Sequence, residues 1–299
     1  MDILTAVINV VIFLALAPLF EGVVRKLYAK VQSRMGPPVV QPYYDLLKLL
    51  GKETLSAGNW AFRIAPMMAL ASIITAVSLM PLGYRAGFLT QYGDIITIIY
   101  LLTLGGVSVL LGALSSKNTY AMVGASREMV TMIMVEPVLA MTFILGALKA
   151  KSLAIDASLA SSLNGSYGVS MVLMLVVFLM ALQAFVARQP FDIAEAEVEI
   201  MEGPFIEYSG PGLALFKYYM MIKQMFYAAL FVAVFVPLVN TGYYIVDVAV
   251  QLVEILAVFV LIALLGSTNP RLRIDQAVKY YALLIVASLV AVGLTAYGI

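Results

Sequence analysis

The 299-residue chain contains neither cysteine nor histidine. The first absence excludes disulfides and thiolate-bound iron–sulfur clusters, and the two together exclude the usual zinc sites and histidine-ligated haem within this chain. Without histidine, the chain also lacks the side chain that most often titrates near neutral pH. Any proton or ion chemistry must therefore use carboxylates, lysines, tyrosines and backbone carbonyls.

Charged residues are scarce as well. They make up 12% of the chain, hydrophobic residues make up 63%, and the mean hydropathy is +1.00. Soluble domains carry about twice this share of charge, so the composition predicts an integral membrane protein. The net charge of +1 gives no case for nucleic-acid binding. The first residues lack a basic region, so we expect the first apolar run to be a retained span rather than a signal peptide.

Eight apolar segments approach the length of about 20 residues that a membrane helix needs. We see no internal repeat and no linker long enough to separate domains, so residues 1–299 should form one polytopic all-α membrane domain. Pro137 predicts a kink in the fourth segment. The expected spans are Ile3–Phe20, Ile64–Leu82, Ile95–Leu114, Met129–Leu148, Val169–Ala187, Leu213–Val236, Ile245–Leu265 and Val278–Tyr297.

The loops between these spans differ in positive charge. Those after odd-numbered spans hold 13 lysines and arginines, and those after even-numbered spans hold three, namely Arg85, Lys149 and Lys151. Because lysine and arginine concentrate on the cytoplasmic side, we expect the odd-numbered loops to be cytoplasmic and both termini to lie outside.

The first loop, Val24–Arg63, contains an amphipathic pattern. After the turn sequence Arg34–Pro38, apolar side chains recur at helical spacing beside charged ones, which predicts an amphipathic helix at the membrane interface. Two interpretations stay open, a plain membrane anchor and a docking surface for a cytoplasmic partner. The pattern comprises Tyr43, Leu46, Leu47 and Leu50 beside Asp45, Lys48 and Lys52.

The acidic segment, Arg188–Gly212, lies between two apolar spans and holds six of the 17 acids. If Pro190 opens a helix, four of these carboxylates share one helical face. Like charges so placed repel, so they need a cation, bound protons or a partner surface; the alternative is a solvated acidic loop. The six acids are Asp192, Glu195, Glu197, Glu199, Glu202 and Glu207, and the expected face holds Asp192, Glu195, Glu199 and Glu202.

Acids within apolar spans cost about 3 kcal/mol each and are functional candidates. Glu136 is the clearest, and Glu128 lies on the same helical face two turns earlier. Lys217 and Lys223 lie early in the sixth span. Asp247 and Glu254 are seven residues apart in the seventh. The alternative for each is a helix–helix ion pair or a snorkelling end residue, which we favour for Asp247, Asp94 and Glu21 near span ends.

Four patches of sequence resemble one known family. The acidic segment reads Pro-Phe-Asp-Ile-Ala-Glu-Ala-Glu-Val-Glu and then Glu-Gly-Pro-Phe-Ile-Glu-Tyr-Ser-Gly, and Ser33–Glu53, Ala125–Pro137 and Arg271–Gln276 accompany it in order. This combination resembles the eight-helix membrane subunit that joins the two arms of respiratory complex I and of membrane-bound nickel–iron hydrogenases. It is similar to the NADH dehydrogenase subunit 1 family.

Two details resemble the hydrogenase branch. Glu202-Gly203-Pro204 is similar to hydrogenase-type versions, whereas quinone-reducing relatives usually carry glycine followed by an aromatic residue there. Lys217 and Lys223 lie in a stretch where the quinone-reducing branch typically carries a glutamate. The resemblance therefore puts a quinone site in doubt.

The resemblance implies a role in coupling rather than catalysis. The chain would have no cofactor of its own; a nickel–iron centre and iron–sulfur clusters would lie in a hydrophilic hydrogenase-like large subunit and an iron–sulfur small subunit, and antiporter-like subunits would adjoin it in the plasma membrane. Ferredoxin-linked proton reduction would drive proton or sodium translocation. The alternatives are a sulfur-reducing relative, a quinone-binding complex I-type subunit and a stand-alone transporter.

The candidate residues fall into two sets. The ion-coupling set is Glu128, Glu136, Asp192, Glu195, Glu199, Glu202, Glu207, Lys217, Lys223 and Glu254. The set for charge pairing and partner docking is Arg34, Asp45, Lys48, Arg127, Arg271 and Arg273.

Overall fold

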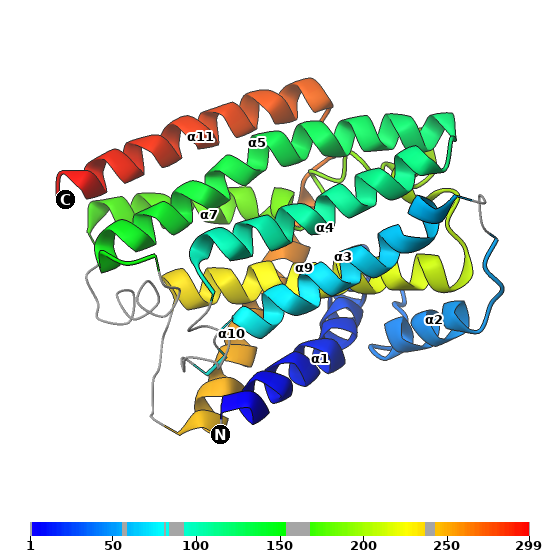
Figure 1. Cartoon of the computed structure of the whole chain (residues 1–299), viewed down its shortest axis with the longest axis horizontal. Helices are drawn as coiled ribbons and strands as arrows, with labels where there is room; N and C mark the ends of the chain where they lie inside the picture. Colours follow the sequence, from blue (N-terminus) through cyan, green and yellow to red (C-terminus); the bar gives the residue numbers. More distant parts are fainter. Residues whose placement is uncertain are drawn as a thin grey trace.

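The computed structural model describes residues 2–55, 59–80, 82–83, 93–153, 168–236 and 243–298, and this part of the chain forms helices and turns without a β-sheet. Its long helices are α1 (Asp2–Val31), α3 (Trp60–Leu79), α4 (Ile95–Ser115), α5 (Thr119–Ala150), α7 (Val169–Phe185), α9 (Gly210–Phe235), α10 (Tyr244–Thr268) and α11 (Ile274–Ala296). Most of these helices run roughly along the longest axis of the molecule, and α10 crosses them steeply (Figure 1).

Seven of these helices are long and apolar enough to cross a membrane, and α7 is a shorter apolar helix of 17 residues. At 1.5 Å per residue α7 is about 25 Å long, the low end for a span. The prediction of an all-α membrane protein with about eight helices is therefore confirmed for the described residues. The first and fourth spans were predicted too short: α1 continues to Val31, and α5 begins at Thr119, so Glu128 lies inside it. Pro137 stands inside α5 without ending it.

Helix α9 lies at the centre of the bundle and packs against α1, α2, α3, α7 and α10. Its apolar stretch is 83% buried, whereas that of α11 is 28% buried. Apolarity does not explain this difference, because α11 has the higher mean hydropathy, 2.0 against 1.4 for α9. Helix α9 is buried because five other helices pack around it. Phe231 and Phe235 pack on Phe178 of α7 with ring centroids 6.0 and 5.6 Å apart. Tyr219, Gln224 and Tyr227 of α9 are thereby held inside the protein.

The first loop folds back onto α1 and forms the expected amphipathic helix, α2 (Gln41–Leu50). Gly22 makes this return possible, because a Cβ there would lie 1.8 Å from the carbonyl oxygen of Val39. The Tyr43 hydroxyl donates to the Ala15 carbonyl and ties α2 to α1. Leu47 and Leu50 of its apolar set are 65% and 51% exposed, which leaves them free to contact a membrane interface.

The acidic segment departs from the prediction. Pro190 does not open a helix: residues 186–196 form turns, followed by a single helical turn, α8 (Glu197–Ile200), and a 3-10 turn, η1 (Gly203–Phe205). The cause is the apolar residues between the acids, since Phe191, Ile193 and Ala196 are all buried and a regular helix would leave part of this set exposed. The expected single carboxylate face is therefore wrong.

Both termini lie in the left half of Figure 1, the C-terminus at the left-hand edge and the N-terminus at the lower edge, and α2 and the acidic segment lie toward the right. Arg85, one of the three positive residues of the even-numbered loops, lies outside the described residues.

Candidate functional site

A cavity of about 590 Å³, the large cavity, opens where α1 ends, beside the acidic segment and the first turns of α9. Its lining is rich in charge of both signs. The charged lining residues are Glu21, Arg25, Arg188, Asp192, Glu195, Glu197, Glu202, Lys217 and Arg271. The segments between the helices thus enclose a polar chamber rather than an apolar pocket.

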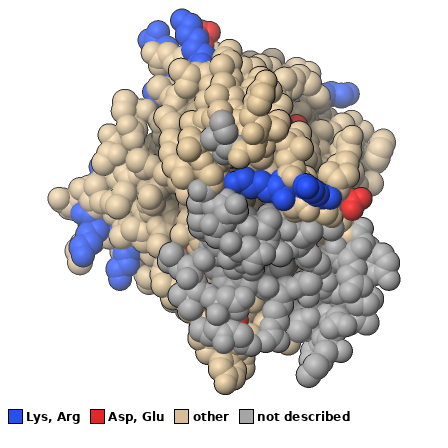
Figure 2. All heavy atoms as spheres, turned by 90° about the vertical axis from the view of Figure 1, so that its left-hand side faces the viewer, with Lys and Arg blue, Asp and Glu red and all other residues tan. Residues whose placement is uncertain are grey.

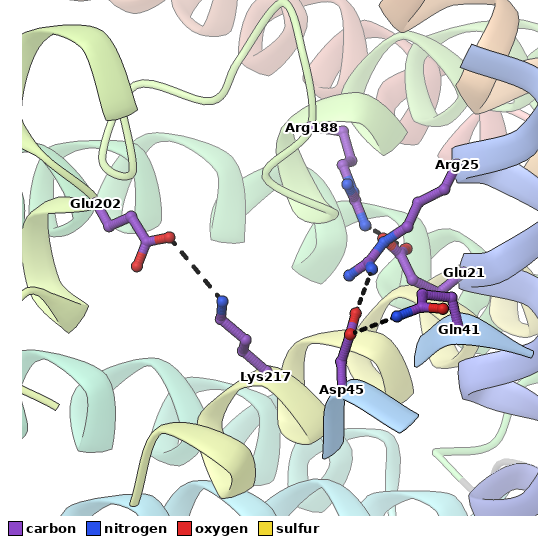
Figure 3. A network of polar contacts seen from close by, with 7 residues as sticks. All are labelled: Glu21, Arg25, Gln41, Asp45, Arg188, Glu202 and Lys217. Carbon is purple, nitrogen blue, oxygen red and sulfur yellow. Dashed lines mark hydrogen bonds and ion pairs between the residues drawn. The ribbon is translucent and has the colours of Figure 1, made fainter. Parts of the chain in front are cut away.

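A chain of alternating charges forms one wall of this cavity (Figure 3). Arg25 donates to Asp45 of α2 at 2.8 Å and to Glu21 at 3.2 Å. Glu21 is 3% exposed and also pairs with Arg188 of the acidic segment. Arg188 in turn donates to the side-chain oxygen of Gln224 on α9 at 3.2 Å. The network therefore ties α1, α2, α9 and the acidic segment together at one point.

The side chains of this network stay ionised because each lies close to a group of opposite charge. Burial alone would lower the pKa of Arg188, but Glu21 and then Glu195 raise it above its usual value, so the guanidinium stays charged. Burial also opposes the ionised form of Asp45, yet hydrogen bonds from Arg25 and Gln41 lower its pKa. Both ends of the chain of charges are therefore ionised at neutral pH.

The remaining acids of the segment fall into distinct environments. Asp192 pairs with Arg271 at 2.7 Å, but burial raises the pKa of Asp192 in spite of that partner. Glu199 pairs with Arg127 at 2.8 Å near the surface, and this hydrogen bond lowers the pKa of Glu199.

Two acids of the segment take side-chain partners from neighbouring helices. Glu202 faces Lys217 at 3.9 Å beside the large cavity (Figure 3). Exposed Glu207 accepts from Asn118 at 2.6 Å. The acids of the acidic segment therefore differ from one another in their partners and in their exposure.

Glu195 is the acid that links the large cavity to the bundle interior. Burial first, and then the charges of Asp192 and Glu128, raise its pKa to about 8, against the opposing effect of Arg188 and Lys223. Glu195 is therefore mostly protonated at pH 7. It lines both the large cavity and a small cavity of about 30 Å³ behind it.

Two small cavities, the inner cavities, continue from Glu195 into the bundle. Glu128, Glu195, Tyr219 and Lys223 line the first. Glu128, Lys223, Tyr227 and Glu136 line the second, of about 40 Å³. Each has room for at least one water molecule. Ionisable side chains thus form a continuous row from the large cavity to Glu136.

The structure brings most of the predicted ion-coupling residues to this row. Glu128, Glu136, Asp192, Glu195, Glu202, Lys217 and Lys223 all line one of the three cavities. Three others lie elsewhere. Glu199 and Glu207 are exposed and bond to Arg127 and Asn118, and Glu254 is buried in α10, away from these cavities.

The predicted charge partners divide in the same way. Arg127, Arg271 and Asp45 make ion pairs. Arg34, Lys48 and Arg273 are exposed, and within the described part of the chain none of these three side chains forms an ion pair with the acidic segment. Of the three expected charge partners Arg34, Lys48 and Arg127, only Arg127 pairs with an acid of the segment here, while Arg271 pairs with Asp192. A role of Arg34 and Lys48 in partner docking stays a prediction.

Sequence reasoning missed the chain of charges itself. Glu21 was set aside as a residue near a span end, and Arg25 and Arg188 counted only toward orientation. The spacing of Glu21 and Arg25, four residues apart, is a signal for an ion pair along a helix. No pattern links Arg188 and Gln224 to them, because Glu21 and Arg188 are 167 positions apart in the sequence and meet only in the folded chain. The described residues also contain no group of three or more acids, histidines or cysteines that could hold a metal ion.

The fold and the cavities define a polytopic membrane protein with a charged chamber at one end and a row of carboxylates leading inward. The chain belongs to the NADH dehydrogenase family, whose model matches residues 3–296. The resemblance to the subunit 1 type is thereby confirmed.

Relatives of known identity agree with this assignment. The chain is 31% identical to formate hydrogenlyase subunit 4 of Escherichia coli over 284 residues, 92% of each chain. It is 34% identical to hydrogenase-4 component C of the same organism, over 91% of this chain and 89% of that protein. Identity to a subunit of the NADH-quinone oxidoreductase of Syntrophotalea carbinolica is 27%, over 86% of this chain and 83% of that protein.

A solved structure has the same fold. It is a chain of the membrane-bound sulfane sulfur reductase, an archaeal respiratory membrane complex, with a TM-score of 0.89 and 26% identity over 98% of this chain and 99% of that chain. The whole length of the described bundle is therefore common to both.

Proposed function

We propose that this chain is the membrane subunit of a hydrogenase-type respiratory complex, which couples ferredoxin-linked proton reduction to proton or sodium translocation. The observation that carries the proposal is the row of cavity-lining groups from Glu195 through Glu128 to Glu136. The identities of 31% and 34% to subunits of formate hydrogenlyase and hydrogenase-4 support the hydrogenase branch.

Electron transfer takes place in partner subunits, because the sequence has no cysteine or histidine to hold a redox metal. A hydrophilic hydrogenase-like large subunit and an iron–sulfur small subunit, with the nickel–iron centre and the clusters, dock at the end that carries α2 and the acidic segment. Exposed side chains there are available for such contacts: Arg34, Lys48, Glu197 and Val198.

A change of charge at the docked partner alters the protonation of the acids around the large cavity, because neighbouring charges shift carboxylate pKa values. Glu195 can change its protonation in response to such a charge, since its pKa of about 8 lies near neutral pH. The carboxylates inward of it titrate as a coupled group. The change then passes through Glu128 and Glu136 to antiporter-like membrane subunits, which carry the translocated ion.

The docking end faces the cytoplasm, and both termini lie outside. The excess of lysine and arginine in the odd-numbered loops supports this orientation. Figure 2 looks onto the opposite end, where most of the visible described residues are neither basic nor acidic and several lysines or arginines lie at the edges and across the middle.

A sulfur-reducing complex is the second candidate, favoured by the TM-score of 0.89 to a sulfane sulfur reductase chain. Purification of the complex in mild detergent with metal analysis separates the two. Nickel together with hydrogen evolution supports the hydrogenase, and iron without nickel supports the sulfur reductase. Inhibition by quinone analogues would instead point to a complex I-type dehydrogenase.

The coupling role is tested by Glu136→Gln, which keeps size and removes the charge. The variant complex should assemble and reduce its acceptor while ion uptake into vesicles falls to background. Asp275→Asn, an exposed acid at the start of α11, is the control and should pump normally. Pumping by the Glu136→Gln complex at the wild-type ratio would reject the relay.

A further inference from the structure

Lys223 occupies a special position among the ionisable groups of the bundle. Of the described residues, it is the one cation that lines both inner cavities. Glu195 borders the first cavity, Glu136 borders the second, and Glu128 borders both. One ammonium group therefore shares its cavities with three carboxyl groups.

The ammonium of Lys223 is not committed to any of these acids. Within the described part of the chain no nitrogen–oxygen contact of 4.0 Å or less joins Lys223 to Glu128, Glu136 or Glu195. Other charged groups around the row are paired in that sense, as Arg127 is with Glu199 and Arg271 with Asp192. The Lys223 side chain is only partly buried and lines both inner cavities.

The surroundings of Lys223 contain no competing charge among the described residues. Besides the three acids, the ionisable groups facing it are the phenols of Tyr219 and Tyr227, one helical turn before and after it on α9. Helices α4 and α7 contribute only apolar or glycine lining, including Gly106 and Phe185. A flexible side chain with a compact charge can relocate in such a space, whereas a planar guanidinium would be held by a carboxylate fork.

We propose that Lys223 is the mobile charge of the relay, and that its ammonium pairs in turn with Glu195 on the outer side and with Glu136 on the inner side. This inference rests on the proposed coupling function and adds which charge stabilises each ionised carboxylate in turn. The ammonium keeps its protons throughout. A proton that leaves one carboxylic acid is taken up by the next carboxylate, and the side that Lys223 approaches is the side that ionises.

The test is made on the whole complex in sealed vesicles, with ferredoxin reduced by dithionite as electron donor and a trapped pH dye. In Lys223→Gln the carboxylates lose their cation and hold protons more tightly. Ions moved per electron should fall about tenfold, and the pH profile of translocation should shift upward by about one unit. Lys279→Gln, which removes an exposed lysine of α11, should leave both readouts unchanged.

Lys223→Arg separates a mobile charge from a fixed one. Arginine restores the positive charge, so the pH profile should return to its wild-type position, but translocation should stay about tenfold low because the guanidinium remains bound to one carboxylate. Full translocation by Lys223→Arg would overturn the proposal, since a static cation would then suffice. If Lys223→Gln does not assemble, Lys223→Arg and the charge-balanced Lys223→Gln/Glu128→Gln variant decide: the pH profile of the latter should lie within about half a unit of wild type.

The outcomes distinguish this inference from the proposed function. Loss of pumping in Glu136→Gln together with normal pumping and an unshifted pH profile in Lys223→Gln would reject the mobile lysine alone. Normal pumping in both variants would reject the relay as a whole.

Discussion

Glu21 of α1 and Arg188 of the acidic segment form an ion pair across 167 positions of sequence, and the carboxylate of Glu21 is almost fully buried. Arg25 binds the other oxygen of this carboxylate at 3.2 Å. The pair joins the end of the first membrane helix to the loop that lines the large cavity. Because a buried charge without its partner is costly, this pair sets how the acidic segment sits on the bundle.

Removal of Arg188 should therefore destabilise the protein more than removal of the pair. Arg188→Gln leaves Glu21 with Arg25 alone, at a cost of about 2 kcal/mol after allowance for the partial exposure of Arg188. The double variant Glu21→Gln/Arg188→Gln should recover at least half of this. Thermal melting of the detergent-solubilised complex measures both; equal and additive losses would show that the pair contributes no coupling.

The raised pKa of Glu195 predicts that the stability of the protein changes with pH in a definite direction. Its pKa rises from 4.5 to about 8 on folding, so between these values the folded state binds more protons than the unfolded state, and stability falls as pH rises through this window. Glu195→Gln abolishes that loss. Its melting temperature should match wild type near pH 4.5 and exceed it increasingly up to pH 8; a constant difference would contradict the burial of this carboxyl.

Glu199 is the matched control with the opposite sign. The hydrogen bond from Arg127 lowers the pKa of Glu199 below 4.5, so its small stabilisation is present above that pH and is lost as pH falls through the lowered value. Glu199→Gln should be slightly less stable than wild type at pH 7 and equal to it in strong acid. The same melting series measures this, and a Glu199→Gln variant that gains stability toward pH 8 would contradict the assignment.

Substitutions of Tyr208 and Gly112 should have non-additive effects on stability, because the two residues are in contact. Tyr208 stacks on Phe62 at 4.0 Å and donates to the Phe62 carbonyl at 3.0 Å, and a Cβ on Gly112 would lie 2.4 Å from the Tyr208 hydroxyl. Gly112→Ala should cost about 2 kcal/mol from overpacking, and Tyr208→Phe about 1 kcal/mol from the lost hydrogen bond.

The double variant Gly112→Ala/Tyr208→Phe removes the clashing oxygen. Its loss should be clearly smaller than the sum of the two single losses, as measured by melting of the solubilised complex. A strictly additive double variant would show that the alanine methyl is accommodated elsewhere.

The extent to which sequence predicted the fold depends on the element. Spans such as Ile95–Leu114 were predicted to within one residue of α4, because a run of apolar residues long enough to cross a bilayer has no other stable solution than a helix. The amphipathic helix α2 was also predicted, because its apolar residues recur at helical spacing. The acidic segment was not, since burial of Phe191 and Ile193 outweighed the helical spacing of its acids.

The composition and apolar runs by themselves determined that this protein crosses the membrane, that its ionisable chemistry rests on carboxylates, lysines and tyrosines, and that Glu128 and Glu136 share one face of a helix. Only the tertiary structure decided which charges meet. Glu21 pairs with Arg188, Asp192 pairs with Arg271, and Lys223 lines the same cavities as three acids. The reason is physical: helix periodicity acts over a few residues, whereas the low polarity of the interior forces distant charges together only once the helices pack around α9.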